Sequence, residues 1–369
     1  MTPDSLLRWR RLCACLLLAG AARAQAAVFP LPPPDQDLVG VPTWINAQPG
    51  DTLATIAFRQ GLGFREVIHA NPGVDPWKLR TGQRIALPTQ LLLPDAPRVG
   101  IVVNVPEMRL YYFPKDDAHV FVYPVAVGRV DWKTPLGDTV VRKKVANPTW
   151  HPTDSIRAEH AAQGDPLPLE VPPGEDNPLG AYALRLGWPD ILIHGTDKPM
   201  GGIGMPVTHG CIRLYPQDIE TLYNVVPVGT PVSVIEQAYK LGRGGTHWYV
   251  EARAGVSADP QAPMGTAEIE DALATLKARA DDEQITPLDW VAIQKILRRG
   301  DGLPALAEPR PPMPLRLALH QPQAAAPRWV LRSRPQLLAV GLLVVLALGV
   351  AGLVRLRFHR RDVGGGAHG

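Results

Sequence analysis

Seven short runs rich in Val, Ile and Tyr follow one another between residues 100 and 235, and they constrain the fold more than any other feature. Turns separate these runs, which read GIVVNV, MRLYYF, VFVYPVAVG, DTVVRKKV, YALRL, DILIH and PVSVI. Such spacing is typical of a mainly β domain of sandwich or barrel type, and it leaves no room for helical crossovers. We therefore predict a mainly β domain over residues 98–236, with one helix at residues 216–223.

The whole chain has 369 residues, enough for several domains, and its 40 prolines and 34 glycines favour strands and turns over a helical bundle. The formal net charge is only +3, and the basic residues are spread along the chain. Because nucleic-acid binding needs a basic stripe or patch, we expect no nucleic-acid partner.

A second, compact unit is predicted between residues 43 and 88, in the order strand, helix, helix, strand. It starts with the strand TWIN and closes with the strand Arg84–Leu87. Asp51 follows a Pro-Gly turn and can accept backbone N–H bonds at the start of the first helix. The tripeptide that begins at Asn71, Asn-Pro-Gly, ends the second helix.

The segments PGDTLATIA, HANPGVD and LRTGQRIALP of this unit resemble a LysM module. The resemblance implies a small α+β fold (βααβ) that binds the N-acetylglucosamine-containing glycan of peptidoglycan or chitin. It also implies a shallow groove at two loops that holds the sugar, formed by Gly50, Asp51, Thr52, Leu53, Asn71 and Pro72. On the residues alone, Asp51 and Asn71 are equally well explained as a helix cap and a turn.

Beyond the β domain, apolar residues at helical spacing in 266–279 and 287–299 predict a helical appendage over residues 237–303. Eight prolines then fall within residues 304–335, which are typical of a semi-extended linker.

The two ends of the chain predict export and membrane anchoring. Residues 1–26 read as a signal peptide, because arginines precede an apolar stretch and small residues at Ala24 and Ala26 offer cleavage sites. Residues 337–354 form an uncharged apolar run that, as a helix, would span about 27 Å, close to a bilayer core of about 30 Å. We predict one C-terminal transmembrane helix in the inner membrane, a basic cytoplasmic tail at residues 355–369 and a periplasmic body. A buried core helix is the alternative.

The chemistry is expected in the segment ILIHGTDKPMGGIGMPVTHGCIRLYP. The other two cysteines lie in the signal segment, so Cys211 is the only cysteine of the processed chain. A thiol has an ordinary pKa of about 8.5 and needs a base to attack near neutral pH. His194 and His209 are both within chain reach of Cys211, and the glycines between them let backbone N–H groups approach a substrate carbonyl.

This segment resembles the catalytic domain of L,D-transpeptidases of the YkuD type, whose pattern is a His, a loop of about fifteen residues, then Ser or Thr, His-Gly-Cys, a hydrophobic residue and Arg or Asn. The resemblance extends from residue 98 to residue 235 and includes TPLGDT and DNPLGAYALRL. The loop between His194 and Cys211 is one glycine longer than the pattern. With the LysM unit and the apolar tail, the chain looks like the Gram-negative subgroup that links peptidoglycan to the major outer-membrane lipoprotein.

The resemblance implies a cysteine acyltransferase that needs no cofactor or metal. Cys211 would attack the carbonyl before the terminal D-Ala of a tetrapeptide stem, and an amine would resolve the thioester, giving a 3-3 crosslink or an attached lipoprotein. The implied roles are Cys211 as nucleophile, His194 as general base and acid, Gly195 as backbone orienter of the His194 ring, His209 as support, Gly210 as oxyanion amide, and Arg213 and Thr208 as substrate-binding residues.

Several alternatives stay open at this point. Water in place of the amine would make the protein an L,D-carboxypeptidase or an amidase that releases wall-attached lipoprotein, and a catalytically idle β domain would make it a peptidoglycan-binding tether. Cys211 could be an inert buried thiol or, with His194 and His209, a metal ligand. Arg213 could be a structural ion-pair residue, and Trp132 is interpreted as a packing residue.

Overall fold

The computed structural model describes residues 27–198, 200, 202–257, 259 and 263–309. The predicted signal peptide, most of the predicted linker, the predicted transmembrane helix at 337–354 and the tail at 355–369 lie outside the described residues.

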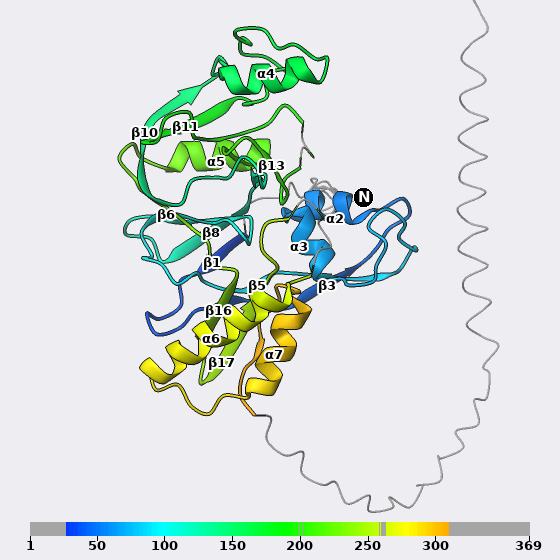
Figure 1. Ribbon diagram of the computed structural model, residues 1–369, viewed down its shortest axis with the longest axis vertical. Helices are drawn as coiled ribbons and strands as arrows, with labels where there is room; N and C mark the ends of the chain where they lie inside the picture. Colours follow the sequence, from blue (N-terminus) through cyan, green and yellow to red (C-terminus); the bar gives the residue numbers. More distant parts are fainter. Residues whose placement is uncertain (1–26, 199, 201, 258, 260–262, 310–369) are drawn as a thin grey trace, which may run out of the picture. The chain divides into compact units, whose positions relative to one another are not determined.

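The β domain is built on one sheet of nine strands in the order β1-β8-β7-β6-β15-β10-β11-β12-β14 (Figure 1). The pairs β6–β15 and β12–β14 are parallel, and the other pairs are antiparallel. The strands are β1 Ala27–Pro30, β6 Gly100–Asn104, β7 Arg109–Phe113, β8 His119–Pro124, β10 Gly137–Ala146, β11 Tyr182–Leu186, β12 Leu192–His194, β14 Ile212–Arg213 and β15 Pro231–Ile235. The prediction of a mainly β domain is confirmed.

The central strands are covered on both faces because alternate side chains enter two different cores. In β6, Ile101 and Val103 join the main core, whereas Val102 joins a second cluster with Tyr111 and Val122. Helix α5 (Pro216–Val225) packs Ile219 and Leu222 into the main core. The predicted helix at 216–223 is therefore present.

Helix α4 and strand β13 of the β domain escaped prediction. Helix α4 (Asp154–Ala162) begins at the capping residue Thr153 and has no buried residue, so no hydrophobic period marks it. Strands β9 (Val127–Gly128) and β13 (Pro206–Thr208) form a short parallel pair that leads into the segment before Cys211.

The LysM unit has the predicted order, with β3 (Thr43–Asn46), α2 (Leu53–Gln60), α3 (Phe64–His69) and β4 (Arg84–Leu87). Strands β3 and β4 are antiparallel, and the two helices bury Leu53, Ile56 and Val67 against them. The cap of α2 is Thr52 rather than Asp51, because the Thr52 side chain accepts from the backbone N–H of Thr55. Strands β2 (Leu38–Gly40) and β5 (Gln90–Leu92) pair beside this unit.

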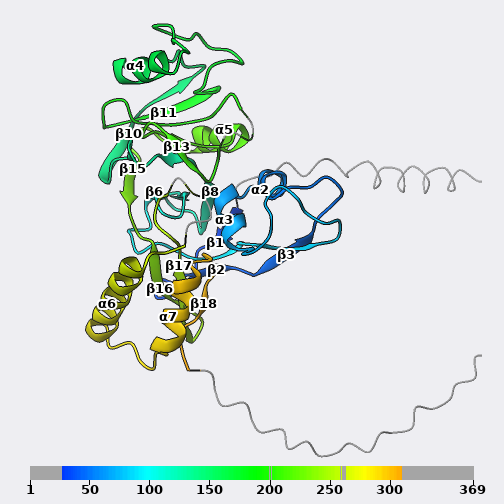
Figure 2. The same ribbon diagram turned by 45° about the vertical axis from the view of Figure 1, so that its right-hand side comes forward.

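The appendage contains the two predicted helices, α6 (Thr266–Asp282) and α7 (Trp290–Arg299), and also a hairpin that the sequence did not predict (Figure 2). Strands β16 (Tyr239–Gly244) and β17 (His247–Ala252) form the hairpin, and β18 (Ala305–Leu306) adds to its edge. One face of this hairpin buries Leu241 and Val250, whereas Lys240 and Glu251 are buried on the other face, so part of its buried surface looks polar in the sequence.

The predicted transmembrane helix requires a correction. In the described part of the chain, no helix is both long and apolar enough to cross a membrane. The longest helix there, α6, has 17 residues and carries charged side chains along its length. The fold class that included a membrane helix is therefore wrong, and the location anchored in the inner membrane, which depended on it, is not supported. The supported fold class is a mainly β catalytic domain with a LysM unit.

Candidate active site

The parallel pairing of β12 with β14 brings the predicted nucleophile and base into one cavity. Ile193 lies opposite Ile212 and His194 lies opposite Arg213. Both isoleucines enter the main core. Because side chains alternate along a strand, His194, Cys211 and Arg213 point to the other face, where all three line a cavity of about 410 Å³.

This cavity is lined from three parts of the β domain. The segment that contains α4 contributes Trp150, His151, Thr153, Ser155 and Ile156, and the segment before Cys211 contributes Thr208 and His209. Trp132, which the sequence suggested as a packing residue, also lines it.

The Cys211 thiol is protonated, and therefore neutral, before the reaction begins. Its Sγ donates to the carbonyl of Asp190 at 3.4 Å. Burial raises the pKa of the Cys211 thiol, against the opposing effects of the Leu192 backbone and the positive charge of Arg213. The positive charge favours the thiolate once a base removes the proton.

His194 is a neutral imidazole. It is 3% exposed, and burial, assisted by the nearby Arg213 charge, lowers its pKa to about 3. The carbonyls of Gly195 and Leu179 oppose this shift in pKa. Within the described chain, the Nδ1 atom has no hydrogen-bond partner of normal geometry, and the role of Gly195 as orienter of the ring stays a prediction.

The segment around Cys211 is held by short hydrogen bonds. The Thr208 hydroxyl donates to the Cys211 carbonyl at 2.6 Å, which gives Thr208 a role inside the loop. Arg213 is bonded through its backbone to Ala126, with N···O distances of 3.0 and 2.8 Å. Gly210 has a φ of 100°, a conformation that side chains other than glycine rarely adopt.

His209 belongs to a polar cluster that the sequence did not predict. Its Nε2 lies 2.8 Å from a carboxylate oxygen of Glu159 in α4 and 3.2 Å from Nη1 of Arg129. The Trp132 ring packs edge-on against the His209 ring at a centroid distance of 4.6 Å. Arg129 and Glu159 lie 80 and 50 residues from His209 along the chain, so no local pattern joins them.

The alternative in which His194, His209 and Cys211 hold a metal finds no support in the geometry. No group of three His, Cys, Asp or Glu side chains among the described residues is arranged to hold a metal ion.

Comparisons with known proteins agree with this geometry. The model of the L,D-transpeptidase catalytic domain matches residues 98–234, and the model of the LysM domain matches residues 47–88. Among curated relatives from Escherichia coli K12, "Probable L,D-transpeptidase YcfS" is 46% identical over 229 residues, which are 61% of this chain and 71% of that protein. "Probable L,D-transpeptidase YbiS" is 37% identical over 299 residues, which are 76% and 92% of the two chains.

The chain belongs to the L,D-transpeptidase family. It is a cysteine-dependent peptidoglycan transpeptidase, and its two matched domains imply that it binds peptidoglycan.

In the LysM unit of this L,D-transpeptidase, several predicted sugar contacts have structural roles. Asp51 accepts from the backbone of Gln48 and forms a bidentate ion pair with Arg59 at 2.7 and 2.9 Å. The Asn71 side chain bonds to the backbone of Val67 and Ala86. Leu53 is fully buried and Thr52 caps α2, whereas Gly50 and Pro72 are exposed.

A different part of the LysM unit is hollowed. The hollow is lined by Phe64, Ile68, Gly73, Val74, Asp75, Pro76 and Trp77. The Trp77 side chain is 61% exposed, and its ring lies 5.3 Å from the Phe64 ring. The sequence signal that could have found this surface is Trp77, an aromatic residue four positions after Gly73 of the predicted Asn-Pro-Gly turn.

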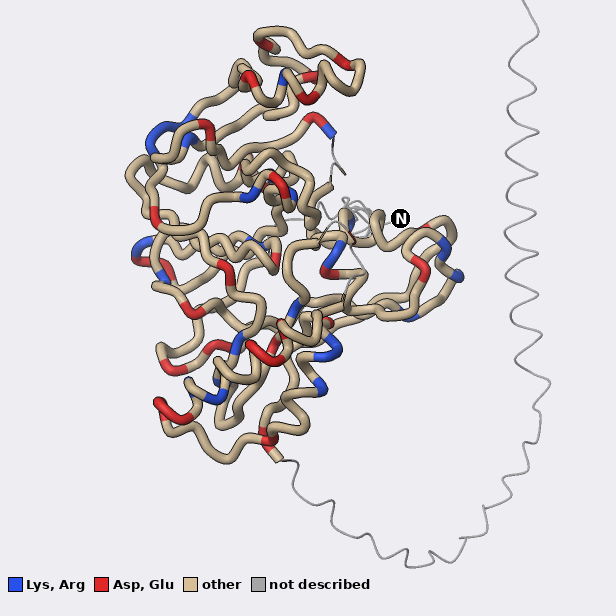
Figure 3. Tube along the Cα trace, in the orientation of Figure 1, with Lys and Arg blue, Asp and Glu red and all other residues tan. Residues whose placement is uncertain are grey.

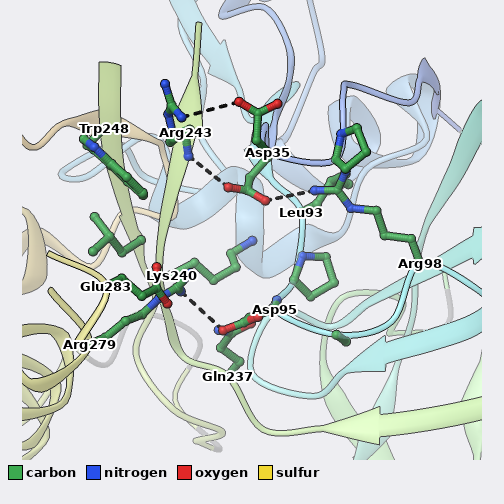
Figure 4. A pocket seen from close by; sticks show the side chains of 15 residues that line it. Asp35, Leu93, Asp95, Arg98, Gln237, Lys240, Arg243, Trp248, Arg279 and Glu283 are labelled. Atoms are coloured by element: carbon green, nitrogen blue, oxygen red, sulfur yellow. Dashed lines mark hydrogen bonds and ion pairs between the residues drawn. The ribbon is translucent and has the colours of Figure 1, made fainter. Parts of the chain in front are cut away.

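A second cavity, of about 420 Å³, lies between the residues near β2 and the appendage (Figure 4). Its charged side chains pair with one another, as in Arg98 with Asp37, Arg243 with Asp35, and Arg279 with Asp95. It contains no thiol or histidine, so it is not the reaction site of the L,D-transpeptidase. Figure 3 shows that acidic and basic residues are interspersed over the described chain.

Proposed function

We propose that Cys211 carries the acyl group during L,D-transpeptidation and that His194 moves the proton. The observation that supports this assignment is the β12–β14 pairing, which lines one cavity with Cys211, His194 and Arg213. His194 is the base rather than His209, because His194 is buried and neutral, whereas the Nε2 atom of His209 is engaged by Glu159.

In the first step, neutral His194 accepts the thiol proton as Sγ attacks the carbonyl before the terminal D-Ala of a tetrapeptide stem. The S–C bond forms, the C–N bond breaks, and His194 returns the proton to the departing D-Ala amine. The thiol and the imidazole begin as a neutral pair, because burial raises the pKa of the thiol and lowers the pKa of the imidazole.

In the second step, an amine attacks the thioester. Its nitrogen forms the new C–N bond, the S–C bond breaks, and the amine proton passes through His194 to the thiolate. The Gly210 and Cys211 amides are suited to hold the oxyanion in both steps. Arg213 lies at the same cavity and is suited to a stem carboxylate, because a guanidinium matches a carboxylate with two parallel bonds.

The test is digestion of sacculi that have been incubated with the protein or with its Cys211→Ala variant, followed by mass identification of the muropeptides. We expect 3-3 crosslinks, or a covalently attached lipoprotein when the lipoprotein is supplied, with the wild type only. New tripeptides without crosslinks would identify an L,D-carboxypeptidase, and loss of lipoprotein from the wall would identify an amidase. Crosslinks formed by Cys211→Ala would contradict the assignment of the nucleophile.

We also propose that the aromatic hollow of the LysM unit holds the glycan, with the Trp77 ring stacked on a sugar face. Trp77→Ala should weaken sedimentation of the protein with sacculi. Trp44→Ala is the matched control, because Trp44 is also exposed, at 55%, but lies outside the hollow. Equal loss in both variants would contradict this placement. Export of the protein, predicted from residues 1–26, stays a prediction.

A further inference from the structure

Helix α4 is a wall of the active-site cavity that is not packed in place by apolar contacts. It lies in the insertion between β10 and β11, at the far end of these strands (Figure 1). Residues at its start, Thr153, Ser155 and Ile156, line the cavity with Cys211. No residue of α4 is buried, so hydrophobic burial contributes little to holding it there.

The base of this insertion is closed independently of α4. The Asn177 side-chain amide, which is fully buried, donates to the carbonyls of Pro148 and Val171 at 2.8 and 3.1 Å. The Asn147 backbone N–H donates to the Ala181 carbonyl at 2.7 Å. These bonds fix where the insertion leaves the sheet, but they do not fix the helix that it carries.

The helix is instead connected to the catalytic loop by Glu159. One carboxylate oxygen accepts from Nη2 of Arg129 at 2.6 Å, and the other lies 2.8 Å from Nε2 of His209. All three side chains are about one quarter exposed. Arg129 is held in turn by Asp131, through an Nε–Oδ1 bond of 2.8 Å.

The chemistry of this cluster selects one form of the His209 ring. A carboxylate can only accept a hydrogen bond and a guanidinium can only donate one, so Nε2 of His209 bonds to one of its two neighbours. The contact with Glu159 is the shorter, at 2.8 Å against 3.2 Å for Arg129, and it favours a proton on Nε2. The side chains of Arg129 and His209 hold the pKa of Glu159 at about 2, so it stays charged near neutral pH. His209 is separated from Cys211 by one residue, Gly210.

We propose that Glu159 is a positioning residue, which ties helix α4 to the ring of His209 so that closure of the cavity wall and placement of the Cys211 loop occur together. The inference rests on the proposed role of Cys211. While the cluster is intact, the α4 wall and the Cys211 thiol keep a fixed placement relative to each other, and a donor stem that enters the cavity contacts both. Loss of the Glu159 charge releases both.

The test is the rate at which a carbapenem acylates Cys211 in the whole protein, followed by intact mass over a range of carbapenem concentrations. Glu159→Gln keeps the size of the side chain and removes its charge, and we expect its limiting rate to fall about fivefold. The concentration at half-maximal rate should change less than about twofold. Glu159→Asp, which keeps the charge on a shorter side chain, should recover part of the rate.

Asp165→Asn is the matched control, because it removes a carboxylate just beyond α4. Among side chains of the described residues, this carboxylate contacts the partly exposed His160, and 78% of the Asp165 side chain is exposed. Its acylation rate should equal that of the wild type. Arg129→Gln should lower the rate, and the double variant with Glu159→Gln should lose less than the product of the two effects. Thermal unfolding of Glu159→Gln should stay near that of the wild type.

An unchanged limiting rate in Glu159→Gln, or an equal loss in Asp165→Asn, would overturn the inference while leaving the role of Cys211 intact. Absence of any adduct on the wild-type protein would overturn the role of Cys211, and the inference with it. The two failures are therefore distinguishable.

Discussion

The catalytic loop that ends at Cys211 is held very differently on its two sides. On the LysM side, the backbone N–H groups of Phe64 and Arg65 donate to the carbonyls of Ile203 and Gly204 at 3.1 and 3.3 Å. The Tyr215 hydroxyl donates to the carbonyl of Leu62 at 3.0 Å. On the α4 side, the connection is the polar cluster of Glu159, Arg129 and His209, whose side chains are about one quarter exposed.

A buried charge network lies behind the LysM side and strengthens the contrast. We call it the junction network, and it consists of Glu66, Glu107, Arg109, Lys240, Glu251 and Arg253. The side chains are 1–5% exposed, compared with 23–27% for the α4 cluster. Water competes poorly for buried pairs and readily for exposed ones. One side of the site is therefore fixed, whereas the other can open.

The largest expected effect is on the buried side. Arg109→Met removes the positive charge beside Glu66, Glu107 and Glu251, and we expect it to lower the free energy of unfolding by about 3–5 kcal/mol. Arg157→Met in α4 is the counterpart, since its partner Asp154 is 97% exposed, and it should cost less than about 1 kcal/mol. Urea unfolding of both variants measures the difference. Equal costs would remove the distinction between the two sides.

A pair of glycines tests the close contact with the LysM unit. Gly204 has a φ of 79°, and a Cβ atom there would lie 2.5 Å from the Cα atom of Gly63. Gly164, just beyond α4, has a φ of 81° with nothing within 4 Å of the added atom. Both alanine variants bear the same backbone strain, so Gly204→Ala should cost about 2 kcal/mol more in unfolding free energy. A smaller cost at Gly204 than at Gly164 would contradict the rigid contact.

The contrast between buried and exposed groups also predicts the pH dependence. Because burial lowers the pKa of His194 to about 3, this base stays available from about pH 5 upward. Burial also raises the pKa of the Cys211 thiol, so the neutral thiol–imidazole pair persists and the carbapenem acylation rate should change less than about twofold between pH 6 and 8. Stopped-flow acylation over this range measures the slope. An acid limb centred near pH 6.5 would contradict the burial of the base.

The smallest expected effect is that of salt. The α4 cluster is partly exposed, so raising the ionic strength to about 0.5 M should lower the wild-type acylation rate about twofold by screening. The acylation rate of Glu159→Gln should not change with salt, because this variant already lacks the Glu159 charge that salt would screen. Urea unfolding, dominated by buried pairs, should respond little. Equal salt dependence of the two acylation rates would show that the exposed cluster does not act on the loop.

The sequence predicted what local patterns specify. Short runs rich in Val, Ile and Tyr indicated the strands of the β domain, and the segment that ends in His-Gly-Cys identified Cys211 and His194 before their strands were seen to pair. The pattern also predicted α6 and α7, because each has an apolar face of helical period. The apolar run at 337–354 led us to predict a membrane helix, and no helix of the described chain supports that prediction.

Tertiary structure decided the features that depend on residues far apart in the chain. Lys240 and Glu107 are 133 residues apart, and only their pairing in the folded protein explains why a strand that looks polar is buried. The sequence left Asp51 and Asn71 open between sugar contacts and a cap and a turn, and the fold pairs Asp51 with Arg59 and bonds Asn71 to the backbone of Val67 and Ala86. Helix α4 has no apolar period, and its link to His209 spans 50 residues. A sequence pattern reports a residue's own burial and turn chemistry, whereas the partner of a charge is set by the fold.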